Sequence, residues 1–375
     1  MERLKFFKYY DLSKLRSSQG HLSTGRQFLE MALLYALKGI GPGYYHSAQM
    51  WNKDKTWQYK FGWLSEKNYR KRLYQYNPRP YQKISMNKLP EKALLSLFKV
   101  PTPEFYGWFH PVHGRDAYGN LFCSGDDIIR VLTSKNIQKF CIKELEGWGG
   151  KGFQAFEVIR KDGKTVLRSM QGDQAVLPVQ DHFNNIQCPH EGLAFEAYIN
   201  QHPVMRALNP SSLNTIRILV VWPYDNDYPK VVGAFVRIGR AGSLVDNTTA
   251  GGLAALVDID TGKVGSAHFK PPHPDIFRIH PDHGSQIYGV IIPHWDGVKD
   301  LLKKTMPIFP NLRFCGFDIA ISVDGPTIVE LNVEADKSGL MQVGICMNDA
   351  IPKINIINEA TAKSPFFQSQ ESGDR

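Results

Sequence analysis

Two carboxylates and an amide stand among apolar residues in the stretch from Arg313 to Asn332, RFCGFDIAISVDGPTIVELN. Glu330 and Asn332 are two residues apart, so on a strand their side chains point to one face. Asp318 lies in the preceding apolar run, which predicts the partner strand of a hairpin. Mg²⁺ prefers such oxygen ligands and usually completes its shell with water and nucleotide phosphates. We therefore expect Asp318, Glu330 and Asn332 to bind Mg²⁺ beside ATP.

The turn of this hairpin decides whether the three side chains meet. With a plain two-residue turn at Asp324-Gly325, Asp318 would pair with Leu331 and face away from Glu330. A three-residue loop, Val323 to Gly325 with the glycine left-handed, sets Asp318 opposite Glu330 instead. We expect this loop. The alternative is a hairpin whose polar residues only face solvent.

A lysine and a glycine-rich loop stand together in KFCIKELEGWGGKGF, residues 139 to 153. The apolar residues around Lys143 predict a strand that presents this lysine to one side. Glycines allow backbone N–H groups to approach phosphate oxygens closely. A hairpin turn is the other interpretation, and the GxxxxGK[ST] phosphate-loop pattern is not present. The four glycines of this loop are Gly147, Gly149, Gly150 and Gly152.

Two arginines interrupt strongly apolar strands. Arg217 lies within TIRILVVW, and Arg237 lies within AFVRIG. A charge in such a strand needs an acidic neighbour or a bound anion. The connection after Arg237 is polar and contains Asp246, Asn247 and Ala250-Gly251-Gly252. Both arginines are therefore candidates for binding phosphate or an acidic side chain.

Length and composition indicate an ordinary globular protein. The 375 residues are 42% hydrophobic, enough for two or three domains. The apolar run from Phe28 to Ile40 is too short to span a bilayer, and no secretory signal is recognisable. Five scattered cysteines form no disulfide or zinc pattern. We expect a reducing, cytoplasmic location.

Positive charge is concentrated in the N-terminal part of the chain. Lys and Arg outnumber Asp and Glu by 45 to 36, and much of this +9 excess lies before residue 100, interleaved with aromatic residues. Such a region can steer an anionic partner. A phosphate-rich substrate, an anionic saccharide or a membrane surface all fit, whereas no nucleic-acid-binding motif accompanies the charge. A solvated basic helical face is the simplest interpretation.

Helices and strands must position these groups. Residues 1 to 85 predict helices and loops, and the apolar spacing from Phe28 to Leu37 predicts a buried helix. Another helix is expected from Pro90 to Phe98, with Lys88 just before it. Strands follow, and Asp162-Gly163 predicts a hairpin turn between two of them.

In this order the motifs resemble the ATP-grasp superfamily, from about Ile84 to Ser338. SMNKL, residues 85 to 89, resembles the segment of D-alanine:D-alanine ligases that supplies an ATP-contacting lysine. Lys143 and the glycine loop are similar to the family's lid, and FEAYI resembles the hinge that holds adenine. The acidic residue that often holds the ribose after the hinge is replaced here by QHPVMRALN. The resemblance implies ATP contacts from Lys88, Lys143, Glu196, Ala197, Tyr198 and Ile199, with the last three contributing backbone atoms.

The stretches TIRILVV, AFVRIG and DNTTAGG resemble bacterial glutathione synthetases, and GFDIA with IVELN resembles the family's metal strands. The resemblance implies that Arg217 and Arg237 bind phosphate or a reaction intermediate. It places the reacting acyl group beside Asn247, Gly251 and Gly252, where backbone N–H groups would stabilise the oxyanion. The three Mg²⁺ ligands match residue for residue.

The phrase HPVMRALNPSSLNTIRI, with the DN…GG stretch, looks most like the sugar-transfer-associated subgroup, which is linked with polysaccharide biosynthesis. The implied fold is α+β, with two subdomains clamping ATP. The implied domains are a helical basic N-terminal region (1–85), a pre-ATP-grasp segment (86–130), a lid subdomain (131–200), a metal-binding C-terminal subdomain (201–362) and a disordered tail (363–375).

The function implied is an ATP- and Mg²⁺-dependent carboxylate-amine ligase. A carboxylate attacks the γ-phosphate of ATP, and an amine then displaces phosphate from the acyl phosphate. The substrates would be an amino acid and a sugar acid. A kinase acting on a hydroxyl, with Asp246 as base near Arg237, is one alternative. A non-catalytic module that binds nucleotide or anionic saccharide is the other.

Overall fold

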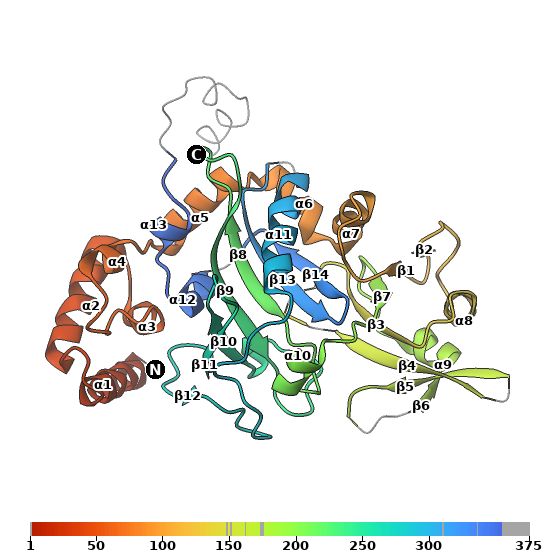
Figure 1. Cartoon of the computed structure of the whole chain (residues 1–375), viewed down its shortest axis with the longest axis horizontal. Helices are drawn as coiled ribbons and strands as arrows, with labels where there is room; N and C mark the ends of the chain where they lie inside the picture. The colour runs from red at the N-terminus through yellow and green to blue at the C-terminus, as the bar shows by residue number, and fades with distance from the viewer. Residues whose placement is uncertain are drawn as a thin grey trace.

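Two antiparallel sheets of seven strands each form the body of the protein, and the helices of residues 2–61 gather at one end of it (Figure 1). The computed structural model describes residues 2–147, 149–150, 152–161, 163–172, 176–309, 311–335 and 337–354. The predicted tail 363–375 and Asp162 of the predicted turn lie outside the described residues. Within the described part, the protein has the α+β organisation that the sequence predicts.

The first sheet has the strand order β2-β1-β7-β3-β4-β5-β6. It begins at Phe105, ahead of the predicted lid boundary at residue 131, because β1 pairs with β7. Helices α8 (Gly125–Ser134) and α9 (Val179–Asn185) share an aromatic-rich core with one face of this sheet. Its strands are β1 (Phe105–Phe109), β2 (Arg115–Asp116), β3 (Lys139–Glu144), β4 (Gln154–Lys161), β5 (Lys164–Ser169), β6 (Val176–Pro178) and β7 (Leu193–Ala197).

The second sheet has the order β12-β11-β10-β9-β8-β13-β14 and lies at the centre of the molecule (Figure 1). Its strands are β8 (Ile216–Val221), β9 (Lys230–Ile238), β10 (Leu253–Val257), β11 (Val264–His268), β12 (Ile276–Phe277), β13 (Phe314–Ser322) and β14 (Gly325–Asn332). The helices before the first sheet are α1 (Glu2–Ser18), α2 (Thr24–Lys38), α3 (Pro42–Ser47), α4 (Trp57–Phe61), α5 (Glu66–Tyr76), α6 (Arg79–Met86) and α7 (Lys88–Leu97). Those after it are α10 (Pro203–Leu208), η1 (Thr248–Ala250), α11 (Trp295–Thr305), η2 (Met306–Ile308), α12 (Lys337–Val343) and α13 (Met347–Ala350).

The two faces of the second sheet differ. One face is covered by a core along its whole length, and the other is covered by a core over only half of it. Ile216, Ile218 and Val220 of β8 point into a core shared with α11. Leu219 and Val221 point the other way, into a second core formed with the N-terminal helices and with α12 and α13. Arg217 belongs to this second face by alternation, but it lies at the opposite end of the strand from Val221. The helices therefore cover one half of this face, and the other half can carry polar side chains.

The hairpin β13–β14 differs from the predicted one, although Asp318 does lie opposite Glu330. Ser322 pairs with Gly325, so the turn has two residues and the predicted three-residue loop is wrong. The register shifts further along, because Asp318 pairs with Glu330 while the next residue of β13, Ile319, pairs with Ile328. A bulge at the intervening Val329 therefore corrects the register.

The apolar helix predicted at Phe28 to Leu37 forms as α2, and it is buried on one face only. Met31 and Leu34 on the inner face are 4% and 0% exposed and belong to a core cluster. Glu30 also lies on this face: its Oε2 atom lies 2.6 Å from the Lys60 Nζ atom and accepts the Tyr45 hydroxyl at 2.8 Å. Leu29, Leu33 and Leu37 lie on the outer face and are 72%, 40% and 62% exposed.

Two further expectations concern the whole chain. Among the residues that the structure describes, no helix combines the length and apolar character that a bilayer crossing requires. The five cysteines are free thiols, as their scattered positions predict.

Candidate functional site

Helix α7 lies where the two sheets meet, and its first residue joins them. The Lys88 ammonium donates to the Gly147 carbonyl at 3.2 Å, in the glycine loop after β3. It also lies 3.8 Å from the Glu330 carboxylate on β14. Asn87 caps this helix by accepting the Leu89 N–H, which fixes where the helix begins. Lys88 therefore stands between the predicted phosphate loop and the predicted metal ligands.

The metal hairpin brings both strand arginines onto one carboxylate. Asp318 pairs with Arg217 across β13 and β8, and Arg217 holds both oxygens of this carboxylate in a bidentate pair. The Arg237 Nη2 atom lies 2.9 Å from Asp318 Oδ2. Burial would raise the pKa of Asp318, but the two guanidinium groups lower it below its usual value. Gly316 leaves space for Arg217, since a Cβ atom there would lie 3.1 Å from Arg217 Cδ.

Asp246 holds the second arginine from its other side. The Asp246 Oδ1 atom lies 3.5 Å from Arg237 Nε, and its Oδ2 atom accepts the Thr215 N–H at 2.7 Å and the Thr215 hydroxyl at 2.5 Å. Arg237 also donates to Asn247 Oδ1 at 3.2 Å. Burial raises the pKa of Asp246, with Arg237 acting in the opposite direction. Asp246 and Asn247, in the polar connection after β9, thus both contact Arg237.

The predicted metal ligands lie close together, and both oxygens of Asp318 are paired with arginines. Asp318 and Glu330 are cross-strand partners, and Asn332 Nδ2 lies 3.5 Å from Asp318 Oδ2. Their donor set is two carboxylates and one amide, which suits Mg²⁺. Among the described residues no group of three or more His, Cys, Asp or Glu side chains could hold a metal ion, so a metal here depends on the Asn332 amide.

The first sheet contributes a buried ion pair near this site. Lys143 and Glu196 lie on neighbouring strands, β3 and β7, and Lys143 Nζ is 2.7 Å from Glu196 Oε2. Burial would lower the pKa of Lys143, yet the Glu196 carboxylate raises it. For Glu196 the directions reverse: burial would raise its pKa, and Lys143 and Lys92 lower it. The Lys143 ammonium therefore occupies Glu196 Oε2, whereas Oε1 is 3.8 Å from the Lys92 ammonium.

The glycine loop reaches across to the second sheet. Gly149, Gly150 and Gly152 have φ angles of 65°, 74° and 68°, a region that favours glycine. A Cβ atom on Gly150 would lie 2.8 Å from Val245 Cγ1 and 3.0 Å from Asn247 Nδ2. A Cβ atom on Gly147 or Gly152 would instead meet the side chain of Glu144, at the end of β3. Glycine at position 150 thus allows the loop after β3 to lie against the connection after β9.

The remaining predicted acyl-site residues are arranged differently from expectation. The Gly251 N–H donates to the Thr248 carbonyl at 3.3 Å, and the Gly252 N–H donates to the Asn247 carbonyl at 3.1 Å. Both N–H groups are therefore used within the turn around η1. The cationic side chain of Arg237 remains beside this turn, through its bond to Asn247 Oδ1.

Comparison with known proteins identifies the family of this chain. The sequence profile of the sugar-transfer associated ATP-grasp family matches residues 67–351. The chain belongs to this ATP-grasp family. No curated protein sequence matches the chain.

Solved structures similar to this ATP-grasp chain include three ligases or synthetases. The L-amino acid ligase from Bacillus licheniformis is 9% identical with a TM-score of 0.37, and the match covers 70% of this chain and 43% of that one. The N5-carboxyaminoimidazole ribonucleotide synthetase from Thermotoga maritima is 10% identical with a TM-score of 0.37, covering 73% and 51%. The D-alanine–D-alanine ligase from Bacillus anthracis is 13% identical with a TM-score of 0.33, covering 68% and 58%. The match thus spans about half the length of these structures.

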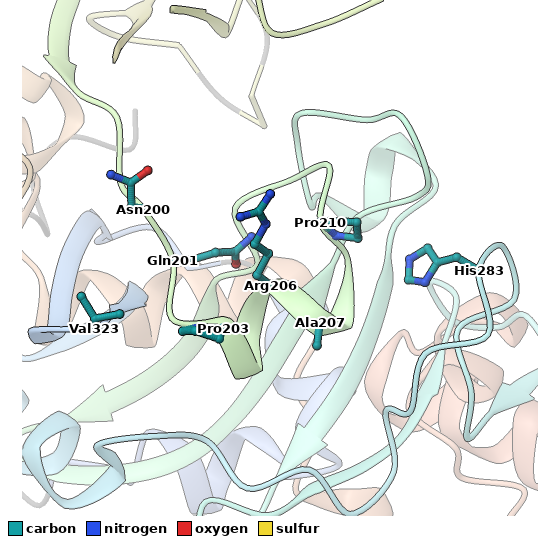
Figure 2. Close-up of a pocket in the computed structure, with 8 residues that line it drawn as sticks. All are labelled: Asn200, Gln201, Pro203, Arg206, Ala207, Pro210, His283 and Val323. Carbon is teal, nitrogen blue, oxygen red and sulfur yellow. The ribbon is translucent and has the colours of Figure 1, made fainter. Parts of the chain in front are cut away.

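The segment predicted to be the hinge is followed in the chain by residues that line a pocket. Ala197 closes β7, and Tyr198 and Ile199 continue as irregular chain outside the strand. The pocket that follows has a volume of about 540 Å³ and opens beside the β13–β14 turn. In Figure 2 Asn200, Gln201 and Arg206 lie on one side of it, and His283 lies on the other. Its lining residues are Asn200, Gln201, Pro203, Arg206, Ala207, Pro210, His283 and Val323.

Sequence reasoning missed two charged residues of the site, both on α7. Lys92 is 1% exposed, and its ammonium donates to the Val329 carbonyl at 2.9 Å and lies 3.8 Å from Glu196. Glu91 is fully buried and accepts the Leu331 N–H at 3.2 Å. The available signal was the spacing of Lys88 and Lys92, which are four residues apart and share a helix face.

Proposed function

We propose that this protein is an ATP-dependent carboxylate-amine ligase that activates a carboxylate as an acyl phosphate. The observation that carries the proposal is the convergence of four cations with the carboxylate–amide set. Lys88 and Lys143 stand on the side of the first sheet, and Arg217 and Arg237 stand on the second. Phosphoryl and acyl transfer both develop negative charge, which such fixed cations stabilise.

The nucleotide base would lie against the apolar wall at the hinge. Cys141 and Ala155 of the first sheet form a small cluster there with Leu244 from the second. The Glu196 carboxylate beside it can accept a hydrogen bond from an amino group, and backbone atoms of Ala197 to Ile199 can pair with the ring edge. Asn200 and Arg206 in the adjoining pocket replace the missing acidic residue as candidate ribose contacts.

The phosphates would extend from the hinge toward Lys88 and the glycine loop. Mg²⁺ bound by Asp318, Glu330 and Asn332 would neutralise charge on the transferring phosphoryl group. Lys143 and Lys88 hold phosphate oxygens, and the contact of Gly150 with Val245 keeps water away from the acyl phosphate. Arg237, fixed by Asp246, stabilises the oxyanion when the amine attacks. Its guanidinium takes the role that the backbone N–H groups of Gly251 and Gly252 were expected to fill.

The contacts of Asp246 weigh against the kinase alternative. A kinase would need an acidic base free to accept a hydroxyl proton. The Asp246 carboxylate is committed to Thr215 and Arg237. The family description makes a saccharide the preferred partner, and we propose a sugar acid and an amino acid as the substrates.

The test is a product analysis with ATP, Mg²⁺ and a panel of amino acids and sugar acids, resolving ADP, AMP and phosphate. ADP and free phosphate that form only when a carboxylate and an amine are both present support the ligase. ADP with a phosphorylated alcohol instead would identify a kinase. Nucleotide binding without turnover across the panel would favour the binding module.

A further inference from the structure

Helix α2 presents an apolar face to the outside of the molecule. The side chains of Leu29, Leu33 and Leu37 follow one another at four-residue spacing, so they form a single stripe. Ala32 and Ala36, which are also exposed, lie between them on the same face. Figure 1 shows α2 at the outer edge of the N-terminal helices, at the opposite end of the molecule from β4 to β6. A partner on this face would leave the nucleotide cleft free.

Aromatic side chains lie beside the C-terminal end of α2. Trp57 and Phe61 of α4 are 40% and 36% exposed, and their rings lie 5.5 Å apart. Lys38 at the end of α2 donates to the Phe61 carbonyl and lies 5.8 Å from its ring, which places α4 beside α2. Tyr35 of α2 is 66% exposed. Tryptophan and tyrosine with apolar neighbours are the residues that favour a membrane–water interface.

The charge of this region identifies the chemistry of the partner. Residues 1–85 contain 16 Lys and Arg against five Asp and Glu, a net charge of +11, whereas the other residues together carry −2. Exposed cations on α1 and α2 include Lys8, Lys14 and Arg26. Contact between two copies through this face would bring two strongly positive regions together. An anionic surface matches both the charge and the apolar stripe.

We propose that the exposed face of α2, defined by Leu29, Ala32, Leu33, Ala36 and Leu37, docks the protein on an anionic phospholipid bilayer. The leucines and the adjoining aromatic rings enter the boundary between headgroups and acyl chains. The surrounding lysines and arginines contact the phosphates. The attachment is peripheral and reversible, because its strength depends on the apolar area of one helix face and on charge.

The test is co-sedimentation of the full chain with vesicles, comparing an equimolar phosphatidylglycerol–phosphatidylcholine mixture with pure phosphatidylcholine. We expect binding to the anionic vesicles only, weakened by salt. The double variant Leu29→Gln/Leu37→Gln should bind about tenfold or more weakly, because two leucines no longer enter the bilayer. The matched control is Leu97→Gln/Leu121→Gln, which changes two leucines that are 74% and 55% exposed elsewhere. This control should bind as the parent chain does.

Three outcomes would overturn the proposal. The first is no binding to anionic vesicles. The second is salt-sensitive binding that the α2 variant retains in full, since the leucines would then have no part in it. The third is a dimer in sedimentation analysis that the α2 variant abolishes, which would assign the face to a second copy. Thermal unfolding of both double variants checks that they remain folded.

Discussion

The charged residues of this site are paired with oppositely charged residues, so replacing one residue also affects its partner. Asp318 pairs with two arginines, and Glu330 pairs with Asp318 across the hairpin and lies 3.8 Å from Lys88. Removing one carboxylate therefore changes both a predicted metal ligand and the balance of the surrounding cations. Glu330 is the better position to alter, because its side chain is 32% exposed and its loss leaves no deeply buried unpaired charge.

The change Glu330→Gln keeps the shape of the side chain and removes its charge. We expect Mg²⁺-dependent ATP turnover to fall by about 100-fold or more, since metal-assisted charge stabilisation supplies several kcal/mol. Steady-state kinetics over a range of Mg²⁺ concentrations would measure the loss. The control Glu334→Gln alters an exposed carboxylate four residues further on and should leave turnover unchanged. Equal losses in the two variants would remove Glu330 from the metal site.

Glu91 predicts a pH dependence of stability. Burial raises its pKa to about 8, above the value of about 4.3 in an unfolded chain. A carboxyl group with a raised folded pKa contributes stability that is complete below the unfolded pKa and is lost as pH rises through the folded pKa. The free energy of unfolding should therefore fall between about pH 4.3 and pH 8 relative to the Glu91→Gln variant. Urea unfolding at a series of pH values tests this, and parallel pH profiles would contradict it.

At the scale of elements, the glycine loop should tolerate no side chain at position 150. In Gly150→Ala the new methyl group would meet Val245, and the positive φ angle of residue 150 would strain the backbone of the alanine. We expect turnover to fall about tenfold or more, with a smaller effect on overall stability. Gly172→Ala is the matched control, because Gly172 has φ of 66° but no atom within 4 Å of a new Cβ. If both variants lose activity equally, backbone strain rather than closure of the cleft is responsible.

Local patterns predicted most of the elements that carry the site. The alternation in IRILVV and FDIAIS is visible in the sequence, so β8 and β13 and their charged residues were expected. The prediction of the hairpin turn was wrong because it did not consider a bulge at Val329. The two-residue turn and this bulge together pair Asp318 with Glu330, as the predicted three-residue loop would also have done. The bulge is held by a contact from outside the hairpin, the bond from Lys92 to the Val329 carbonyl.

Tertiary contacts limited the prediction elsewhere. Helix α2 has the spacing of a buried helix, but only the face of Met31 and Leu34 is buried, together with Glu30, which pairs with Lys60, 30 residues away in the chain. Lys92 and Glu91 look like surface residues of a helix in the sequence. Their burial depends on two sheets that come together only in the folded chain.

For the molecule as a whole, the N-terminal helices are part of the sheet's core rather than an appendage. Leu219, Val221 and Phe235 of the second sheet share one buried cluster with Trp63 of the helical region. Asn77 bonds to the Phe314 and Val333 carbonyls, and the Tyr69 hydroxyl bonds to the Ala335 carbonyl. The N-terminal helices therefore pack on one half of the sheet face that carries Arg217, and this packing stabilises the strand on which Arg217 lies.

Replacing a tryptophan in this core tests that dependence. Trp63→Ala removes a side chain with 0% exposure and should lower the free energy of unfolding by about 3–5 kcal/mol. Trp57→Ala, at 40% exposure, should cost about 1 kcal/mol or less. Denaturant unfolding followed by far-ultraviolet circular dichroism gives both values. Similar values for the two variants would mean that the helical region does not stabilise the sheet.

Helix α7 also sets how the two walls of the cleft can separate. Its N-terminal residue is bonded to the chain leaving β3, through the Lys88 N–H to the Leu145 carbonyl and through the Lys88 ammonium to Gly147. One turn later, Lys92 is bonded to β14. A motion of one sheet relative to the other that keeps these bonds must therefore rotate about α7. The glycine loop after β3 would move with the first sheet in such a rotation, away from Val245 and Asn247 of the connection after β9.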